Sequence, residues 1–346
     1  MTPSVVLVTG VSKFVGAHLA TRLAADPSIE RVLGVDTVPP PRDLLRGMGR
    51  AEFIRADIRN PLIAKVIESA EVDTVVHTAL TSSGPNNSGS RVAAKEMNVI
   101  GTMQLLAACQ RSPRVRRLVL KSTTAVYGSS PRDPAIFTEA MGPKALPSGG
   151  YAKDAAEIEG YVRGFGRRRP DVSVTVLRFA NLVGPRIVTS LTRYFSMPVV
   201  PTVLGYDARM QLLHSEDALA VLEQATREDL PGVFNVGAPG VLMLSQAIRR
   251  AGRVQASVPG AVLGPVSRFF RGARLVDFTP EQMRFLNFGR VVDTDLLRDT
   301  FRFTPRWTTT QAFDDFVQGH QLRPVVSPSQ VSAVEKRVLA TARALR

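Results

Sequence analysis

Two glycines near the N-terminus have the spacing of a phosphate-binding turn. The segment 9–16 is Thr-Gly-Val-Ser-Lys-Phe-Val-Gly, and it joins an apolar stretch, Val5–Val8, to an amphipathic helical pattern over Val15–Ala25. A turn between a strand and a helix N-terminus directs backbone N–H groups at an anion, so this segment predicts a pyrophosphate site. Gly10 allows the tight turn, and Gly16 lets the helix lie close to the strand.

A carboxylate follows at the distance that a dinucleotide site requires. Asp36 comes directly after the second predicted strand, Arg31–Val35, and twenty residues after Gly16. A carboxylate at that strand end accepts hydrogen bonds from the adenosine ribose hydroxyls. The segment 9–36 therefore predicts an adenine dinucleotide site that prefers the cofactor without a 2′-phosphate.

The elements that would position these residues alternate in type through the first half of the chain. Further strands are predicted over Phe53–Arg55, Thr74–His77, Leu118–Lys121 and Val172–Leu177, and helices near Pro61–Ser69, over Val92–Gln110 and from Tyr151. Such alternation predicts an α/β protein with a Rossmann-type, doubly wound parallel sheet. Uninterrupted apolar stretches such as Val5–Val8 are typical of strands buried on both faces.

The composition changes after Arg178: proline and glycine become frequent, and the helical patterns become shorter. We expect a dinucleotide-binding domain over 1–180 and a smaller, irregular substrate-binding part over 181–325, which could be interleaved with the first. The remainder, 326–346, is expected to be a helix, amphipathic and basic. We interpret it as a packing or solvated helix, with peripheral membrane contact as the alternative.

Composition excludes several classes of protein. The chain has 346 residues, 44% of them hydrophobic, and a formal net charge of +14. Its basic residues are mostly arginine and are spread out, which favours a solvated or anion-attracting surface over a nucleic-acid-binding face. One cysteine and four scattered histidines predict neither a disulfide framework nor a metal site. With no apolar run near the roughly 20 residues of a bilayer span, we expect a cytoplasmic protein.

The set of motifs resembles the extended short-chain dehydrogenase/reductases, the NAD-dependent epimerase/dehydratase family that includes UDP-galactose 4-epimerase and dTDP-glucose dehydratase. The matching segments are TGVSKFVG (9–16), GVD (34–36), ADIRN (56–60), HTAL (77–80), NVIGT (98–102), STTAVYG (122–128), Tyr151, RFANLVGPR (178–186) and HSEDA (214–218). The resemblance covers about residues 1–310. It implies NAD as cofactor, hydride transfer at a substrate carbinol, and a homodimer formed through the helices near 92–110 and 151–168.

The resemblance also implies roles for individual residues. Thr123 and Tyr151 match the catalytic pair, while Asn181 borders the substrate. Arg209 is the candidate for a phosphate-binding arginine, although it lies one place out of register. The cofactor contacts implied by the family are Gly10, Ser12, Lys13, Phe14, Val15, Gly16, Asp36, Asp57, Ile58, Thr78, Ala79, Leu80, Asn98 and Phe179.

Lys13 departs from the family pattern, because these epimerases usually carry a glycine there. In other short-chain reductases a lysine at this place often meets the 2′-phosphate of NADP. Asp36 opposes that interpretation, since a carboxylate repels a phosphate dianion. We therefore favour NAD, with NADP as the alternative.

The family pattern Tyr-x-x-x-Lys is also broken. Ala155 stands where the lysine belongs, and Lys153, about 200° around the helix from Tyr151, cannot replace it. The family lysine lowers the tyrosine pKa and binds the nicotinamide ribose, and alanine does neither. Tyr151 would then be a poor general base, but it could still donate a hydrogen bond to a carbonyl.

Three functions are compatible with these residues. The first is an NAD-dependent sugar-nucleotide epimerase/dehydratase-like oxidoreductase acting on a small, anionic substrate. The second, suggested by Ala155, is a catalytically degenerate NAD-binding module. The third, suggested by the displaced Arg209, is a dehydrogenase acting on a lipid- or sterol-like alcohol.

Overall fold

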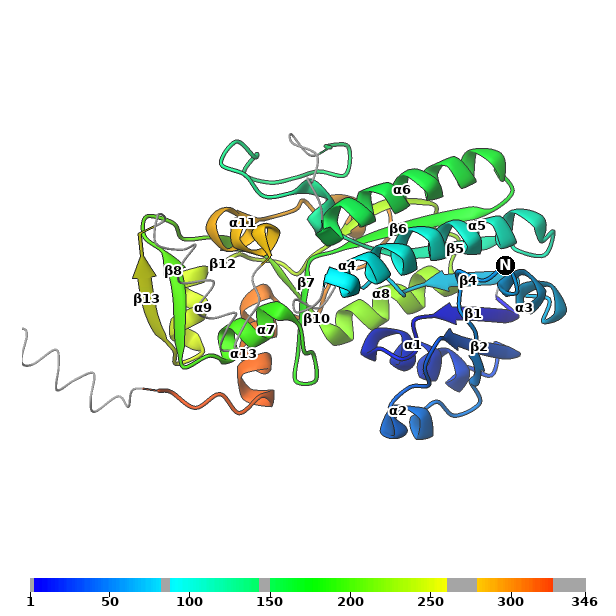
Figure 1. Cartoon of the computed structure of the whole chain (residues 1–346), viewed down its shortest axis with the longest axis horizontal. Coiled ribbons are helices and arrows are strands. Elements are labelled where there is room, and N and C mark those ends of the chain that lie inside the picture. The colour runs from blue at the N-terminus through cyan, green and yellow to red at the C-terminus, as the bar shows by residue number, and fades with distance from the viewer. Residues whose placement is uncertain (1–2, 82–87, 143–149, 260–278, 326–346) are drawn as a thin grey trace, which may run out of the picture.

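A central sheet of seven parallel strands organises the molecule (Figure 1). The computed structural model describes residues 3–81, 88–142, 150–259 and 279–325, so the helix expected over 326–346 lies outside the described residues. The strands are β1 (Val5–Thr9), β2 (Arg31–Asp36), β3 (Glu52–Arg55), β4 (Thr74–His77), β5 (Arg117–Thr123), β6 (Ser173–Phe179) and β11 (Gly232–Val236). Their order is β11-β6-β5-β4-β1-β2-β3, which confirms the prediction of a Rossmann-type doubly wound sheet.

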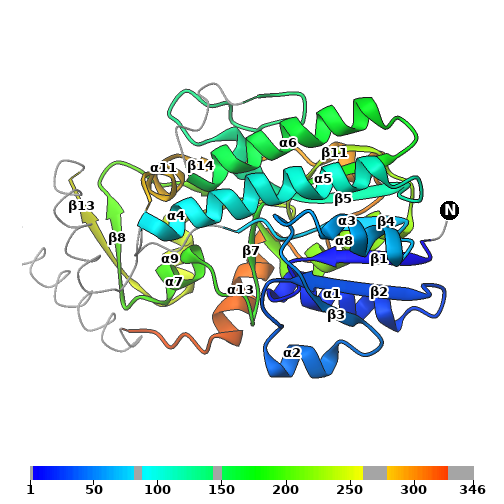
Figure 2. The same ribbon diagram turned by 45° about the vertical axis from the view of Figure 1, so that its right-hand side comes forward.

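Helices cover both faces of this sheet, as Figures 1 and 2 show from two directions. One face is covered mainly by α1 (Phe14–Ala25) and α8 (Ser215–Arg227). The other is covered by α3 (Ile63–Ser69), α5 (Gly101–Arg111) and α6 (Gly150–Arg168). Because each strand alternates its side chains between the two faces, β1 sends Val6 and Val8 to one core and Val5 and Leu7 to the other.

The helix predicted over 92–110 is interrupted. It consists of α4 (Ser88–Lys95), a π-helical turn (Glu96–Ile100) and α5. The extra residue of a π turn changes the direction of the side chains around it, and such turns occur often at functional sites. Here the turn carries Asn98.

The sheet takes its last strand from the second half of the chain. β11 pairs with β6 in parallel, with Phe234 opposite Leu177. α8, also from the second half, packs against α1. The chain therefore leaves the sheet after Phe179 and returns to it at Gly232, across the boundary that the sequence placed at 180.

A smaller region lies beyond the carboxyl ends of the strands (Figure 1). It contains two- and three-stranded sheets and its own apolar cluster, in which the ring of Phe195 packs 4.9 Å from that of Phe313. Its elements are β7 (Asn181–Val183), α7 (Ser190–Ser196), β8 (Val199–Val203), β9 (Arg209–Met210), β10 (Leu212–His214), β12 (Leu242–Met243), α9 (Leu244–Arg250), β13 (Val254–Val258), α11 (Pro280–Phe288), β14 (Gly289–Arg290) and α13 (Thr309–Gly319). Within the described part of the chain, no helix has the length and apolar character needed to cross a bilayer.

Candidate functional site

The glycine turn between β1 and α1 leaves no room for side chains. Gly10 has a φ of +81°, which favours glycine, and a Cβ there would lie 2.8 Å from the Cα of Ala79. A Cβ on Gly16 would collide with the Gly10 carbonyl. At these two glycines the backbones of the turn, of helix α1 and of the segment after β4 therefore approach closely. The first backbone N–H groups of α1 lie at this turn, as an anion site requires.

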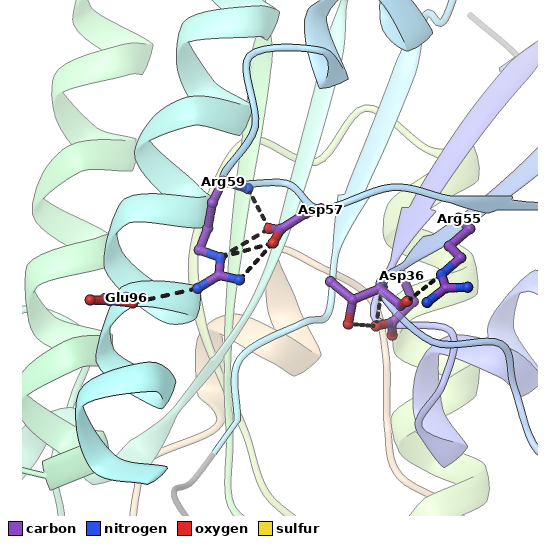
Figure 3. Close-up of polar contacts among 6 residues, drawn as sticks. Asp36, Arg55, Asp57, Arg59 and Glu96 are labelled. Atoms are coloured by element: carbon purple, nitrogen blue, oxygen red, sulfur yellow. Dashed lines mark hydrogen bonds and ion pairs between the residues drawn. The ribbon is translucent and has the colours of Figure 1, made fainter. Parts of the chain in front are cut away.

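The Asp36 carboxylate is held at the end of β2 by two backbone N–H groups. Its Oδ2 accepts a hydrogen bond from Ser12 N at 2.9 Å, and its Oδ1 accepts one from Thr37 N at 2.7 Å. Asp36 therefore ties the glycine turn to the neighbouring strand. Figure 3 shows Asp36 near Arg55, whose Nε donates to the Thr37 carbonyl.

A cavity of about 200 Å³ opens between the glycine turn and the end of β2. It brings together six of the residues expected to bind the cofactor: Gly10, Ser12, Lys13, Asp36, Ile58 and Ala79. Its lining also includes Thr37, Val38, Thr81 and Met97, which the sequence analysis missed. Thr37 and Val38 follow Asp36 directly, so their position next to the carboxylate was the signal that could have identified them.

The Asp57 carboxylate is paired with the guanidinium of Arg59 and is not part of the cavity lining. Its carboxylate pairs with the Arg59 guanidinium at 2.6 Å, and Arg59 also reaches Glu96 at 3.5 Å (Figure 3). The hydrogen bond from Arg59 holds the pKa of Asp57 below its ordinary value. The pair orders the loop that places Ile58 against the cavity.

The other residues expected around the cofactor lie behind the cavity wall. Thr78 Oγ1 donates to the Thr9 carbonyl at 2.6 Å, and the Asn98 amide bonds both the N–H and the carbonyl of Thr81. Asn98 also donates to Asp154 at 3.1 Å. These bonds hold the segment after β4 in place. Phe14, Val15, Leu80 and Phe179 are likewise absent from the lining, and Val15, Leu80 and Phe179 are buried.

His77, at the end of β4, is a buried neutral histidine. Its Nδ1 lies 2.7 Å from Thr9 Oγ1 and its Nε2 lies 2.8 Å from Thr102 Oγ1. Burial, with a smaller contribution from the charge of Lys121, lowers the pKa of His77 from 6.5 to about 4. The imidazole thus bridges two hydroxyls beneath the site without carrying a charge.

This histidine predicts an acid-sensitive fold. A pKa that is lower in the folded state stabilises that state above the unfolded value of 6.5, and the stabilisation is lost as the pH falls toward about 4. We expect His77 to remove about 3 kcal/mol from the free energy of unfolding between these pH values. Urea unfolding at stepped pH would show it. The His77→Gln variant should lose less stability over the same interval, and equal losses would contradict the assignment.

Thr123 and Tyr151 meet where β5 and the N-terminus of α6 converge. The Thr123 side chain forms a hydrogen bond with the Tyr151 phenol, and Thr123 Oγ1 also accepts from Ala125 N at 3.2 Å. Burial raises the pKa of Tyr151 to about 12, with a further contribution from the Glu281 carboxylate, against the opposing effect of the Thr123 bond. The phenol therefore stays protonated at neutral pH and acts as a hydrogen-bond donor.

Ala155 lies in an apolar cluster. It is fully buried and packs with Val126, Tyr127, Phe137 and Val292. Among the described residues, the charged groups that act on the Tyr151 phenol are Glu281 and Asp154, and both are acidic. The electrostatic environment thus opposes ionisation of the tyrosine, where the family lysine would favour it.

Glu281 was not anticipated from the sequence. It comes from the first turn of α11, and its Oε1 accepts the N–H of Ala152, next to Tyr151, at 3.1 Å. A side chain on Gly150, whose φ is +71°, would collide with the other oxygen. Burial raises the pKa of Glu281 above its ordinary value. A carboxylate from residue 281 thus reaches the catalytic candidate, which no local pattern could indicate.

A second cavity, of about 330 Å³, lies between the segment 130–137, which follows β5, and the smaller region. Arg209 lines it, with Nη2 donating to the Ala135 carbonyl at 2.8 Å. Arg290 also lines it, and its Nε donates to the Gly128 carbonyl at 2.8 Å. Asn181 lies outside this lining, on β7 opposite Leu212 of β10. Of the two residues that the sequence assigned to the substrate, only Arg209 lines this cavity.

A family model and several relatives match this chain. A model of the "NAD dependent epimerase/dehydratase family" matches residues 6–237. An uncharacterized protein of Mycobacterium tuberculosis is 53% identical over 340 residues, which cover 98% of this chain and 90% of that protein. The UDP-glucuronic acid decarboxylase 6 of Arabidopsis thaliana is 27% identical over 251 residues, 68% of this chain and 69% of the decarboxylase.

Two solved structures share the fold. The dTDP-glucose 4,6-dehydratase of Bacillus anthracis, in complex with NAD, superposes with a TM-score of 0.70 at 19% identity, covering 92% of this chain and 96% of that one. The UDP-glucose 4-epimerase of Thermus thermophilus, also in complex with NAD, has a TM-score of 0.70 at 21% identity and coverages of 92% and 99%.

Proposed function

The chain belongs to the NAD dependent epimerase/dehydratase family, and from this we propose that it catalyses hydride transfer at a carbinol carbon of a small, anionic substrate of the sugar-nucleotide class. NAD, when bound, accepts the hydride and can return it. The observation that carries the proposal is the Asp36 carboxylate, held by Ser12 N over a cavity whose walls include the glycine turn.

The residues present fit this cofactor. Gly10 and Gly16 leave the backbone N–H groups accessible to a pyrophosphate, and Asp36 offers a charged acceptor to ribose hydroxyls. The same carboxylate would repel a 2′-phosphate, which supports NAD over NADP. Lys13, in the same lining, offers its charge to the pyrophosphate.

In this proposal Thr123 and Tyr151 hold the substrate oxygen. In the reducing direction the neutral phenol gives its proton to the substrate carbonyl oxygen as the carbon receives a hydride, and in the reverse direction the resulting phenolate takes the carbinol proton back. Thr123 orients the phenol. Arg209 lines the second cavity, and in this proposal it pairs with a phosphate of the anionic substrate. Arg290 lines the same cavity, but its guanidinium donates to Gly128, Thr124 and Ser129.

Removing the phenol hydroxyl tests the proposed chemistry. We expect Tyr151→Phe to lower kcat about 100-fold, because a positioned proton donor contributes on this scale, while the Kd for NAD stays unchanged. Turnover of a panel of UDP- and dTDP-sugars, followed by chromatography of the products, measures the effect. Tyr161→Phe is the matched control, since Tyr161 is an exposed tyrosine on the same helix.

One observation supports a second candidate function. Ala155 is buried in an apolar cluster and Tyr151 is surrounded by acidic groups, as expected of a protein that binds NAD without turnover. Wild-type protein that binds NAD and converts none of the sugar nucleotides would favour this binding module. Turnover that is lost in Tyr151→Phe would exclude it.

We further propose a homodimer formed through α5 and α6. Ile100, Met103 and Tyr161 lie on or beside these helices and are each exposed by 40% or more. Apolar side chains exposed together on neighbouring helices are typical of a subunit contact. The molecular mass in solution tests this proposal, and a monomer at micromolar concentration would contradict it.

A further inference from the structure

Lys121 is an unusual lysine. Among the lysines that the structure describes, it alone is partly buried; the others, Lys13, Lys65, Lys95 and Lys153, are exposed. Over the described ranges, no ion pair or hydrogen bond joins its ammonium to another group. Burial lowers the pKa of Lys121 to about 8. A partly buried ammonium with no acceptor in the protein leaves its donors unsatisfied, so this one indicates a ligand that offers acceptors, such as the hydroxyls of a ribose.

The ladder between β5 and β6 shows where the ammonium points. Lys121 lies opposite Leu177, on the face of the sheet that also carries Phe179. Its Nζ, however, lies over the Phe179 ring, 6.0 Å from the ring centroid. Phe179 is two residues closer to the carboxyl edge of the sheet than Leu177, the residue opposite Lys121, and two residues span about 6.5 Å along a strand. The side chain therefore extends along the sheet toward the edge where a dinucleotide binds.

The position of β5 in the sheet indicates which half of the dinucleotide lies near Lys121. The glycine turn follows β1, and β5 is the second strand from β1 in the order β5-β4-β1, about 10 Å away. Asp36, for the adenosine ribose, lies on the opposite side of β1. A group at the end of β5 thus lies beyond the pyrophosphate turn, on the nicotinamide side. Thr123, two residues further along β5, belongs to the same end of the site.

We propose that Lys121 contacts the cofactor at the nicotinamide half of the site. From strand β5 it supplies the positive charge that Ala155, at the lysine position of helix α6, cannot supply. The assignment rests on the proposed NAD site. Lys121 replaces the family lysine only as a cofactor contact. It does not lower the tyrosine pKa, because its charge is not among those that act on the Tyr151 phenol. Lys121 would therefore affect the cofactor and leave the tyrosine protonated.

The charge has a specific consequence for affinity. The oxidised nicotinamide ring is cationic and the reduced ring is neutral, so a nearby ammonium disfavours NAD⁺ relative to NADH. Both forms carry the same pyrophosphate, so any attraction to the phosphates cancels in the ratio of the two Kd values. The ratio Kd(NAD⁺)/Kd(NADH) thus reports the charge at the ring.

Calorimetric titration of NAD⁺ and NADH into wild-type protein, Lys121→Met and Lys121→Arg tests the proposal. We expect the ratio to fall about tenfold in Lys121→Met and to stay near the wild-type value in Lys121→Arg, which keeps the charge. Lys13→Met, at the pyrophosphate turn, is the control; it should weaken both forms equally. If cofactor copurifies, it is first removed and the thermal unfolding curve is used to verify the fold.

The outcomes separate this assignment from the proposed function. An unchanged ratio in Lys121→Met, with cofactor still bound, would overturn the assignment and leave the NAD site intact. Equal weakening of both forms would also overturn it, because it would place Lys121 at the phosphates. Wild-type protein that binds neither form would overturn the proposed function and this assignment with it.

Discussion

Replacing Asp36 with alanine is expected to weaken NAD binding about 100-fold. A carboxylate that accepts hydrogen bonds from ribose hydroxyls contributes about 1.5–3 kcal/mol for each bond. The substitution also frees the N–H groups of Ser12 and Thr37, which Asp36 now holds, so the glycine turn would lose its link to β2. Isothermal titration of the purified variant measures the loss.

The preference for NAD over NADP gives the more specific test of the Asp36→Ala variant. Since the carboxylate that would repel a 2′-phosphate is gone, NADP binding should weaken less than NAD binding, and the preference for NAD should largely disappear. Asp43→Ala is the matched control, because Asp43 is an exposed aspartate on α2 (Arg42–Gly47), the next helix along the chain. Wild-type NAD affinity in Asp36→Ala would show that the first cavity is not the ribose site.

Glu159→Ala is expected to have the largest effect on stability. The Arg178 guanidinium and the Glu159 carboxylate form a buried pair, with Nη2–Oε2 at 2.7 Å and Nε–Oε1 at 3.0 Å, and exposures of only 8% and 6%. Removing one partner leaves the other charge uncompensated, which costs about 3–5 kcal/mol of unfolding free energy. Urea denaturation followed by circular dichroism measures this loss.

The same network connects the strand of Thr123 to the rest of the fold. Ser122 Oγ donates to Glu159, Arg178 Nη1 donates to the Tyr127 hydroxyl at 2.7 Å, and that hydroxyl donates to Asn235 of β11 at 2.7 Å. Glu159→Ala should therefore also disturb the end of β5 that carries Thr123. We expect kcat to fall even where the variant remains folded.

Two comparisons make the stability prediction specific. Glu52→Ala removes the exposed partner of Arg31 and should cost less than about 1 kcal/mol. The double variant Glu159→Leu/Arg178→Leu should recover part of the loss of Glu159→Ala, because it removes both buried charges. A loss below 1 kcal/mol in Glu159→Ala would show that solvent reaches the pair.

The sequence by itself determined the parts of this protein that depend on neighbouring residues. The phosphate-binding turn, the carboxylate at the end of β2 and six of the seven sheet strands were predicted from local patterns, since glycine conformations and apolar periodicity are local properties. Val5–Val8 illustrates this, because an uninterrupted apolar stretch is typical of a strand buried on both faces. The resemblance to the family rests on the same segments.

Only the tertiary structure decided what depends on residues far apart in the chain. β11 (Gly232–Val236) was missed because its place in the sheet depends on pairing with β6, more than fifty residues earlier. Glu281 reaches Ala152 across 129 positions, and that contact shapes the proton chemistry of Tyr151. Lys121 has no local feature that distinguishes it from an exposed lysine. Burial and charge pairing are set by the sum of distant contacts, and no short segment contains that information.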